Sequence, residues 1–412
     1  MSELEKTNEI GMNIKKVETE FSGINFQANI WKSYLVSFFR GFHFISGVLL
    51  PFFLGWGKLT FVEVMLLQSY FTIMIVLFEI PCGAISDYIS RKFSLFLGAV
   101  AMALAALIYS SIPDIFVFML GETLFALGFA LVSGSDEAFI FDTLRKMERE
   151  NEMPKIMGRF RSFFLAGIGI SAPIGSMIPL FFPIRYSMTF MFFPFIIAAL
   201  ISLSLREPNH DLEREPSNYL SVVQSGFREL KKNKNLRILA FDFIIVDVLV
   251  FLLIWTYQLY LEVLSVPLVF FGFVAASMTL TQIVFFNLIP KLQQRFKNKK
   301  LFLTIYTLIP GLAYIVIAFI IFTPISIALI LIIIGIGFSR NIIFINGINR
   351  NIEEENRATV LSTISMLRSF IISILYPIIG LLVMWNLNYT FIILGISIIL
   401  VALLSSVKNE HL

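Results

Sequence analysis

Charged and small residues are regularly spaced at the end of one apolar run, in the stretch EIPCGAISDYISRK. Gly83, Asp87, Arg91 and Lys92 follow the order G-x-x-x-D-x-x-x-R-K, and Glu79 stands one helical turn before Gly83. Acidic and basic side chains at such a boundary can pair with neighbouring helices, and an acid can also approach a helix N-terminus, where unpaired N–H groups favour negative charge. The alternative is a solvated loop whose charges only set the orientation of the chain.

Ionisable side chains also lie inside the apolar runs, where they are costly and normally face a protein interior or a water-filled cavity. The third, sixth, ninth and twelfth runs hold none of them, so we expect these four runs to face lipid. Each ionisable residue either binds a proton or a charged substrate group, or pairs with a neighbouring helix. The candidates are Arg40, His43, Glu79, Glu122, Asp136, Glu137, Asp247, Arg340 and Arg368, with Asp242 as a further acid.

Two of these sets are close in the sequence. Arg40 and His43 are three residues apart and are expected on one face of a helix. Asp136 and Glu137 are adjacent and point to different faces, so we expect one of them to pair with a neighbour such as Arg161.

A third set is defined by depth. Asp247, Arg40 and Arg368 lie nearest the middle of their runs, where they either bind a charged group of a substrate or neutralise one another.

The elements that position these residues are apolar runs of about 20 residues, which is the length of a membrane-spanning helix. Hydrophobic residues make up 57% of the chain and charged residues 15%, whereas soluble domains carry about 25% charged residues. Runs this long must satisfy their own backbone in lipid and are therefore predicted to be helices. We expect twelve, at 31–56, 61–85, 93–112, 115–141, 160–182, 186–205, 236–261, 267–290, 301–322, 325–349, 358–382 and 389–406.

Basic residues are concentrated in alternate loops, at 145–149, 231–237 and 291–300, whereas the opposite loops hold little more than Lys58 and Arg185. Short loops rich in Lys and Arg stay in the cytoplasm. The distribution predicts a multi-pass protein of the cytoplasmic (inner) cell membrane with both termini in the cytoplasm. The net charge of +4 is explained by this topology, and we expect no nucleic acid partner.

One connection is long, and it lies halfway along the chain. Its polar sequence contains an amphipathic pattern in SNYLSVVQSGFREL, which predicts a helix on the cytoplasmic surface. Two halves of six helices around a midplane site are typical of one class of secondary transporter. The expected organisation is a cytoplasmic tail over 1–30, a six-helix bundle over 31–205, the linker over 206–235, a second bundle over 236–406 and a tail over 407–412.

The spacing from Gly83 to Lys92 resembles the loop signature of the major facilitator superfamily, and the resemblance extends to the twelve runs and the central linker. The phrases EIPCGAISD, SGSDEAFIFDTL and RATVLS are similar to bacterial and archaeal members near the tetracycline and macrolide efflux proteins. Proton-driven drug exporters carry an arginine in the outer half of helix 4, where this chain has Glu122. The resemblance implies an all-α membrane fold with two six-helix bundles around a central cavity.

The resemblance also implies a conformational lock at the cytoplasmic ends of the two halves. Asp87 would meet the N-terminus of helix 11, and Arg91 would pair with Asp142 at the end of helix 4. Gly83 would allow close backbone approach, as small residues do at membrane helix contacts. Lys92 completes the motif.

The function expected from these observations is secondary active transport by alternating access. Proton-coupled export of a small amphiphilic molecule is the first hypothesis, import of a nutrient or metabolite is the second, and a non-transporting membrane sensor is the third. The sequence has no P-loop, no H-E-x-x-H and no paired-cysteine spacing, so we expect no enzymatic activity, no cofactor and no metal. The expected partners are the small-molecule substrate, protons and the lipid bilayer, and we expect a monomer.

Overall fold

The computed structural model describes residues 26–88, 90–208, 219–352 and 356–411, without the side chains of 80, 84–88, 219–223 and 358. The described residues form helices and connecting segments and contain no strand. Eleven helices within them are long and apolar enough to cross a membrane, or twelve when the bent first pair is counted as one span. The predicted all-α membrane class is therefore confirmed.

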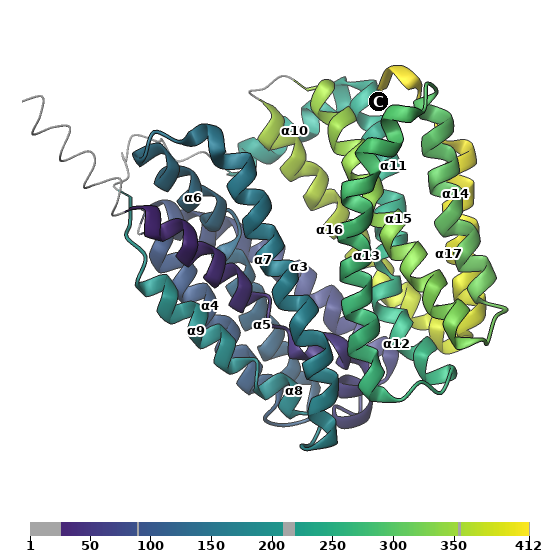
Figure 1. Ribbon diagram of the computed structural model, residues 1–412, viewed down its shortest axis with the longest axis horizontal. Helices are drawn as coiled ribbons and strands as arrows, with labels where there is room; N and C mark the ends of the chain where they lie inside the picture. The colour runs from purple at the N-terminus through teal and green to yellow at the C-terminus, as the bar shows by residue number, and fades with distance from the viewer. Residues whose placement is uncertain (1–25, 89, 209–218, 353–355, 412) are drawn as a thin grey trace, which may run out of the picture.

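Two bundles of helices make up the molecule (Figure 1). The N-terminal bundle begins with the helix over residues 26–40 and the short segments η1 (Phe44–Gly47), α2 (Leu49–Pro51) and η2 (Phe52–Trp56). It continues with α3 (Phe61–Tyr88), α4 (Arg91–Tyr109), α5 (Ile115–Val132), α6 (Ser135–Lys146), α7 (Met153–Met177), α8 (Tyr186–Thr189) and α9 (Phe192–Leu203). The C-terminal bundle contains α11 (Lys234–Phe251), α12 (Leu253–Val263), α13 (Phe271–Arg295), α14 (Lys299–Ile317), α15 (Thr323–Arg350), α16 (Arg357–Trp385) and α17 (Leu387–Leu404).

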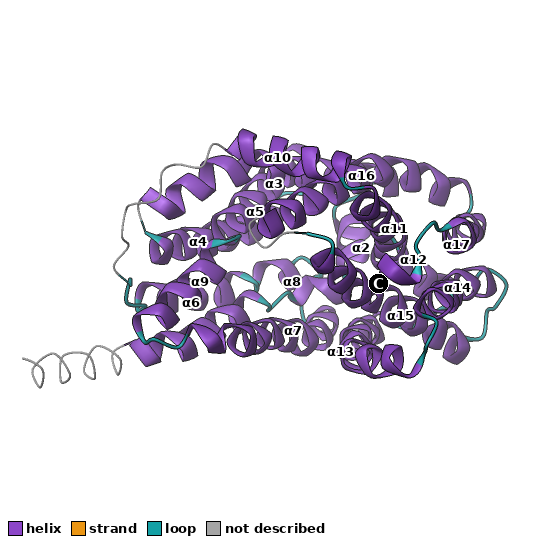
Figure 2. Ribbon diagram, turned by 90° about the horizontal axis from the view of Figure 1, so that it is seen from above, coloured by secondary structure: helices purple, strands orange, loops and turns teal. Residues whose placement is uncertain are grey.

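The bundles touch along two helix pairs, α3 with α16 and α7 with α13 (Figure 2). The helices α4, α9, α14 and α17 lie at the two outer ends, away from this contact. These four are the third, sixth, ninth and twelfth spans. Their position agrees with the expectation that they face lipid.

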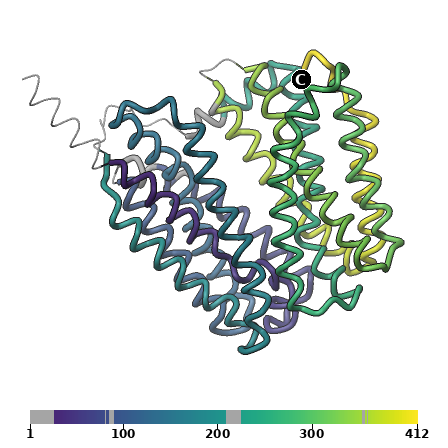
Figure 3. Tube along the Cα trace, viewed as in Figure 1, coloured from purple at the N-terminus to yellow at the C-terminus, as the bar shows by residue number. Residues whose placement is uncertain are grey.

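The two bundles meet at one end and diverge toward the other, where the C-terminus lies (Figures 1 and 3). The diverging end also carries the predicted amphipathic helix, α10 (Tyr219–Lys232), which packs against α16. We call this end the linker side and the opposite end the far side. The approach of α10 to α16 is close, since a Cβ on Gly226 would lie 1.9 Å from the Thr363 hydroxyl.

Four of the expected spans are interrupted, and one of them is the sixth, which breaks between α8 and α9. The first is not one helix over 31–56, because its α-helix ends at Arg40 and the segment Leu49–Trp56 is bent by 64° from the part before it. The fourth breaks between α5 and α6 at Gly134, whose φ of +76° suits a residue without a Cβ. The seventh breaks at Leu252, between α11 and α12.

Close packing of α7 explains the bend in the first span. Gly167, Ser171 and Gly175 form the small-residue stripe that the sequence predicts for packing, and all three are buried. A Cβ on Gly175 would lie 1.7 Å from the Phe44 carbonyl, and one on Gly167 would lie 2.3 Å from the Phe38 carbonyl. The first span therefore follows α7 at backbone distance.

The C-terminal segment packs onto the bundle. The short helix η7 (Asn409–His411) ends at a buried His411. The Asn409 side chain accepts a hydrogen bond from the Lys300 backbone at 2.7 Å. The segment therefore covers the linker-side ends of α14 and α15.

Candidate functional site

Arg91 forms the ion pair with Asp142 that the sequence analysis expected. Its guanidinium also donates to the Ala138 carbonyl at 2.7 Å, so it holds the start of α4 against α6. The arginine side chain is only 5% exposed. Pairing at this depth joins two helices of one bundle.

An acid in the linker occupies the N-terminus of α4. Glu207 accepts hydrogen bonds from the backbone of Arg91 and of Lys92, each at 2.9 Å, and from the Ser90 hydroxyl at 2.7 Å. A carboxylate on free N–H groups at a helix start is a favourable arrangement. The linker is thereby tied to the motif loop, a contact that the sequence analysis missed.

The close backbone approach expected at Gly83 stays a prediction. Among the described residues, a Cβ placed on it would meet nothing within 4 Å, and the bundles diverge at this end (Figure 1). Asp87 lies in α3, but its side chain is outside the described residues, so its approach to α16 stays a prediction. Glu79 lies two turns earlier in α3 and is partly buried.

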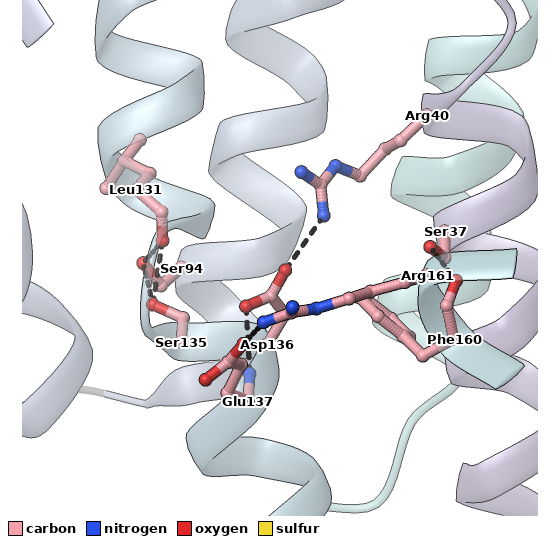
Figure 4. Close-up of polar contacts among 9 residues, drawn as sticks. All are labelled: Ser37, Arg40, Ser94, Leu131, Ser135, Asp136, Glu137, Phe160 and Arg161. Atoms are coloured by element: carbon pink, nitrogen blue, oxygen red, sulfur yellow. Dashed lines mark hydrogen bonds and ion pairs between the residues drawn. The ribbon is translucent and has the colours of Figure 1, made fainter. Parts of the chain in front are cut away.

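The two adjacent acids of α6 have different partners, as expected (Figure 4). Asp136 pairs with Arg40 at 3.3 Å, and these side chains are 17% and 9% exposed. Glu137 pairs with Arg161 at 2.8 Å, at the surface. Asp136 is thus the acid that enters the bundle interior.

Arg40 is not part of a midplane set with Asp247, because its described partner is Asp136 in its own bundle. The expectation that His43 shares its helix face is also wrong, because the helix ends at Arg40. The His43 ring packs edge-on against Phe195, with centroids 5.9 Å apart.

An ion pair is also buried inside the C-terminal bundle. Arg340 of α15 donates to Asp242 of α11 at 2.7 Å, and the two side chains are 2% and 7% exposed. The other oxygen of Asp242 accepts a hydrogen bond from Ser405 at 2.5 Å. The Arg340 guanidinium also lies over the Phe344 ring, 4.9 Å from its centroid. Both side chains of this pair are therefore buried within the bundle.

Another ion pair of the C-terminal bundle joins α11 and α16. The Nε of Arg368 in α16 donates to Asp247 in α11 at 2.5 Å. Asp247 is 7% exposed, whereas Arg368 is 27% exposed. Of the two alternatives for these residues, mutual pairing is the one present in this conformation.

Glu122 is a buried acid of a different kind. It is 4% exposed and lies on α5. It accepts a hydrogen bond from the Gln68 amide at 2.7 Å and lies within hydrogen-bonding reach of the Tyr109 hydroxyl. In the part of the chain that the structure describes, no cation lies within ion-pair distance of it. Such carboxyl groups in membrane helices mark proton or ion pathways.

The far side is closed by backbone contacts between the bundles. A Cβ on Gly272 of α13 would lie 2.0 Å from the Ala172 carbonyl of α7. A Cβ on Gly47 would lie 2.6 Å from the Cα of Gly272. Further along, the Ser69 hydroxyl of α3 donates to the Ser373 carbonyl of α16 at 2.5 Å.

Gln258 of α12 ties the two bundles where the first span is broken. Its amide nitrogen donates to the Ser46 carbonyl, and its oxygen accepts from the Leu50 backbone, both at 2.9 Å. Irregular backbone at membrane depth must be satisfied by protein groups. The sequence analysis counted only ionisable residues and missed Gln258 and Gln68, although a polar amide within an apolar run is the same signal.

The fold resembles that of solved transporters. The nucleoside transporter NupG is 14% identical, with a TM-score of 0.72, over 93% of this chain and 97% of that one. The D-xylose-proton symporter is 11% identical, with a TM-score of 0.75, over 94% and 99%. A bacterial homologue of the human lysosomal transporter Spinster, inward-facing and occupied, is 15% identical, with a TM-score of 0.69, over 92% and 94%.

No curated protein matches the sequence. The family model described as Major Facilitator Superfamily matches residues 33–377. That match covers most of both bundles, including the motif loop and the ion pairs. The chain therefore belongs to the major facilitator superfamily.

Proposed function

We propose that this protein is a secondary active transporter that works by alternating access and exports a small amphiphilic molecule in exchange for protons. The observation that carries the proposal is the asymmetry between the two sides. The bundles are joined at the far side through Gly272 and Gln258, and they diverge at the linker side. Such an arrangement is that of one end state of a rocking pair of bundles.

Proton coupling is assigned to Glu122. An ionised carboxylate buried away from any cation is costly, and the described partners of Glu122 are neutral groups. Its neighbour Gln68 precedes Ser69, which donates across the bundle contact to Ser373. A change of charge at Glu122 is therefore linked, through its hydrogen bond with Gln68, to the contact between α3 and α16, which must open during the cycle.

The direction and the kind of cargo are also proposals. The similarity of three sequence stretches to efflux proteins supports export of a small amphiphilic molecule. The basic loops support an orientation with the linker side in the cytoplasm, in the cytoplasmic membrane. We propose that one chain is the working unit.

The test is transport by the purified protein in liposomes, with a compound library and an imposed pH gradient of either sign. The proposal predicts that at least one amphiphilic compound moves against its own gradient when protons move the other way. Movement together with protons would support import instead. Absence of flux for every compound under every gradient would contradict the assignment as a transporter.

A further inference from the structure

We propose that Arg368 is the substrate-anchoring residue and that the cargo carries an anionic head group beside an apolar or aromatic body. This inference rests on the proposed transport function and adds the charge of the cargo. Its starting point is the contrast between Arg368 and three arginines that are buried in ion pairs within the bundles, namely Arg40, Arg91 and Arg340.

Those other arginines are closed to any solute. The side chains of Arg40, Arg91 and Arg340 are 9%, 5% and 2% exposed, whereas that of Arg368 is 27% exposed. Arg40 and Arg340 also each have at least one buried guanidinium nitrogen with no hydrogen-bond partner among the described residues, which shows how tightly the protein encloses these two groups. Within the same part of the chain, no nitrogen of Arg368 is both buried and unpaired.

The free edge of Arg368 has a defined orientation. Asp247 accepts the hydrogen bond that the Nε–H group donates, and neither terminal nitrogen has a protein partner among the described residues. The guanidinium also lies over the Phe251 ring, 5.0 Å from its centroid. The two terminal nitrogens therefore present N–H groups, which suit two oxygens of a carboxylate or phosphate group.

This edge faces the interior of the molecule. Ile372, Tyr376 and Ile379 follow Arg368 along the same face of α16, and all three are buried. The lipid-facing residues lie on the opposite face of α16, namely Phe370, Ile374, Ile378 and Leu381, which are between 44% and 63% exposed. The exposed part of Arg368 is thus directed away from the lipid face.

Two further aromatic residues, Trp255 of α12 and Tyr376 of α16, contact each other. The Trp255 indole donates to the Tyr376 hydroxyl at 3.2 Å, and the two rings meet edge to face at 5.9 Å. Both residues are almost completely buried. Phe251, whose ring lies under the guanidinium, is therefore the aromatic group directly beside the cationic edge. A cationic edge next to an aromatic ring suits an amphiphilic anion.

The experiment is ligand binding to the purified protein in lipid nanodiscs at one pH, without any gradient. The probes are phenylpropanoate, phenylpropanamide and phenylpropylamine, and the same three head groups on an octyl chain. Charge-assisted hydrogen bonds to an oriented guanidinium predict that the acid binds about tenfold or more tightly than its amide. The amine is expected to bind most weakly.

Substitutions at Arg368 and Asp247 separate anchoring of the cargo from a structural role of the ion pair. Arg368→Gln alone leaves Asp247 without its partner, so the double variant Arg368→Gln, Asp247→Asn is made with it. We expect the double variant to fold and to bind acid and amide equally. Asp247→Asn alone should keep the preference for the acid. Arg161→Gln, which removes an exposed arginine of a surface pair, is the control and should leave the preference unchanged.

The proposal is overturned if the wild-type protein binds the acids no more tightly than the amides, or if the double variant retains the preference. These outcomes are independent of the transport assignment. Flux of neutral compounds only would reject the anionic cargo and keep the transporter, whereas anion binding without flux in liposomes would reject transport and keep the site.

Discussion

Arg340 and Asp242 form an ion pair between the tenth and seventh spans, and it repeats, with acid and base exchanged, the pair of Arg40 and Asp136 between the first and fourth spans. Each pair joins the first and fourth helices of its own bundle, and neither crosses between bundles. These ion pairs thus hold each bundle together, whereas the described contacts between bundles include small residues, apolar side chains and neutral hydrogen bonds. This division suits two rigid bodies that must separate and rejoin.

Replacement of Asp242 with Asn should destabilise the protein, because Arg340 would remain charged and buried. Removal of one partner of a buried pair costs about 3–5 kcal/mol. The measurement is thermal unfolding of the purified protein in detergent. Replacement of both residues, as Asp242→Leu with Arg340→Met, should recover most of the loss. The control is Glu137→Gln, in a surface pair whose contribution is about 0–1 kcal/mol. Unchanged unfolding of Asp242→Asn would show that the pair does not hold the bundle.

Replacement of Asp87 with Asn should leave the protein folded and inserted but should reduce transport, because the lock at the linker side would lose its acid. The population should shift toward the conformation that is open at the linker side. Accessibility of cysteines introduced on that side measures the shift. Native background is low, since Cys82 is the only cysteine and is buried. Full transport together with unchanged accessibility would remove the lock hypothesis.

Replacement of Glu122 with Gln should reduce flux driven by a pH gradient at least about tenfold. Exchange of labelled for unlabelled substrate should continue. Glutamine can keep the hydrogen bond to Gln68 but cannot carry a proton. Glu137→Gln is the matched control, because Glu137 is exposed and paired at the surface. Gradient-driven flux in Glu122→Gln at the wild-type rate would move proton coupling to another acid, with Asp136 and Asp247 next to be tested.

A leucine at Gly272 should abolish transport by preventing closure of the far side. Even a Cβ there would lie 2.0 Å from the Ala172 backbone, and backbone cannot move aside as a flexible side chain can. The control is Gly169→Leu on α7, where a Cβ meets nothing within 4 Å. Substrate flux in liposomes is the measurement. Normal flux in Gly272→Leu would mean that the far side need not close during the cycle.

The fold class could be predicted from the sequence because length, apolarity and basic loops each report directly on a membrane helix. The pairing of Arg91 with Asp142 also followed from the motif. Helix breaks were harder, because the bend after Arg40 depends on the backbone approach of Phe44 to Gly175, which a single sequence does not reveal.

The partners of central charges were left open for a physical reason. Asp247 had two candidate bases at similar depth, and depth alone does not show which helices are neighbours. The structure pairs it with Arg368 and gives Arg40 to Asp136. Neutral polar residues such as Gln258 were missed because a glutamine in an apolar run carries no charge to count, although its burial is costly until the broken backbone near Ser46 satisfies it.

The most direct test of alternating access is a pair of distances measured by double electron–electron resonance in liposomes. One pair of spin labels, at Glu148 and Lys297, spans the linker side, and the other, at Ser111 and Ile321, spans the far side; all four residues are exposed. The wild-type protein is compared with Gly272→Leu after Cys82 is replaced with serine. The account predicts that Gly272→Leu lengthens the far-side distance and shortens the linker-side distance. Lengthening at the far side with no change at the linker side would contradict the coupling of the two sides.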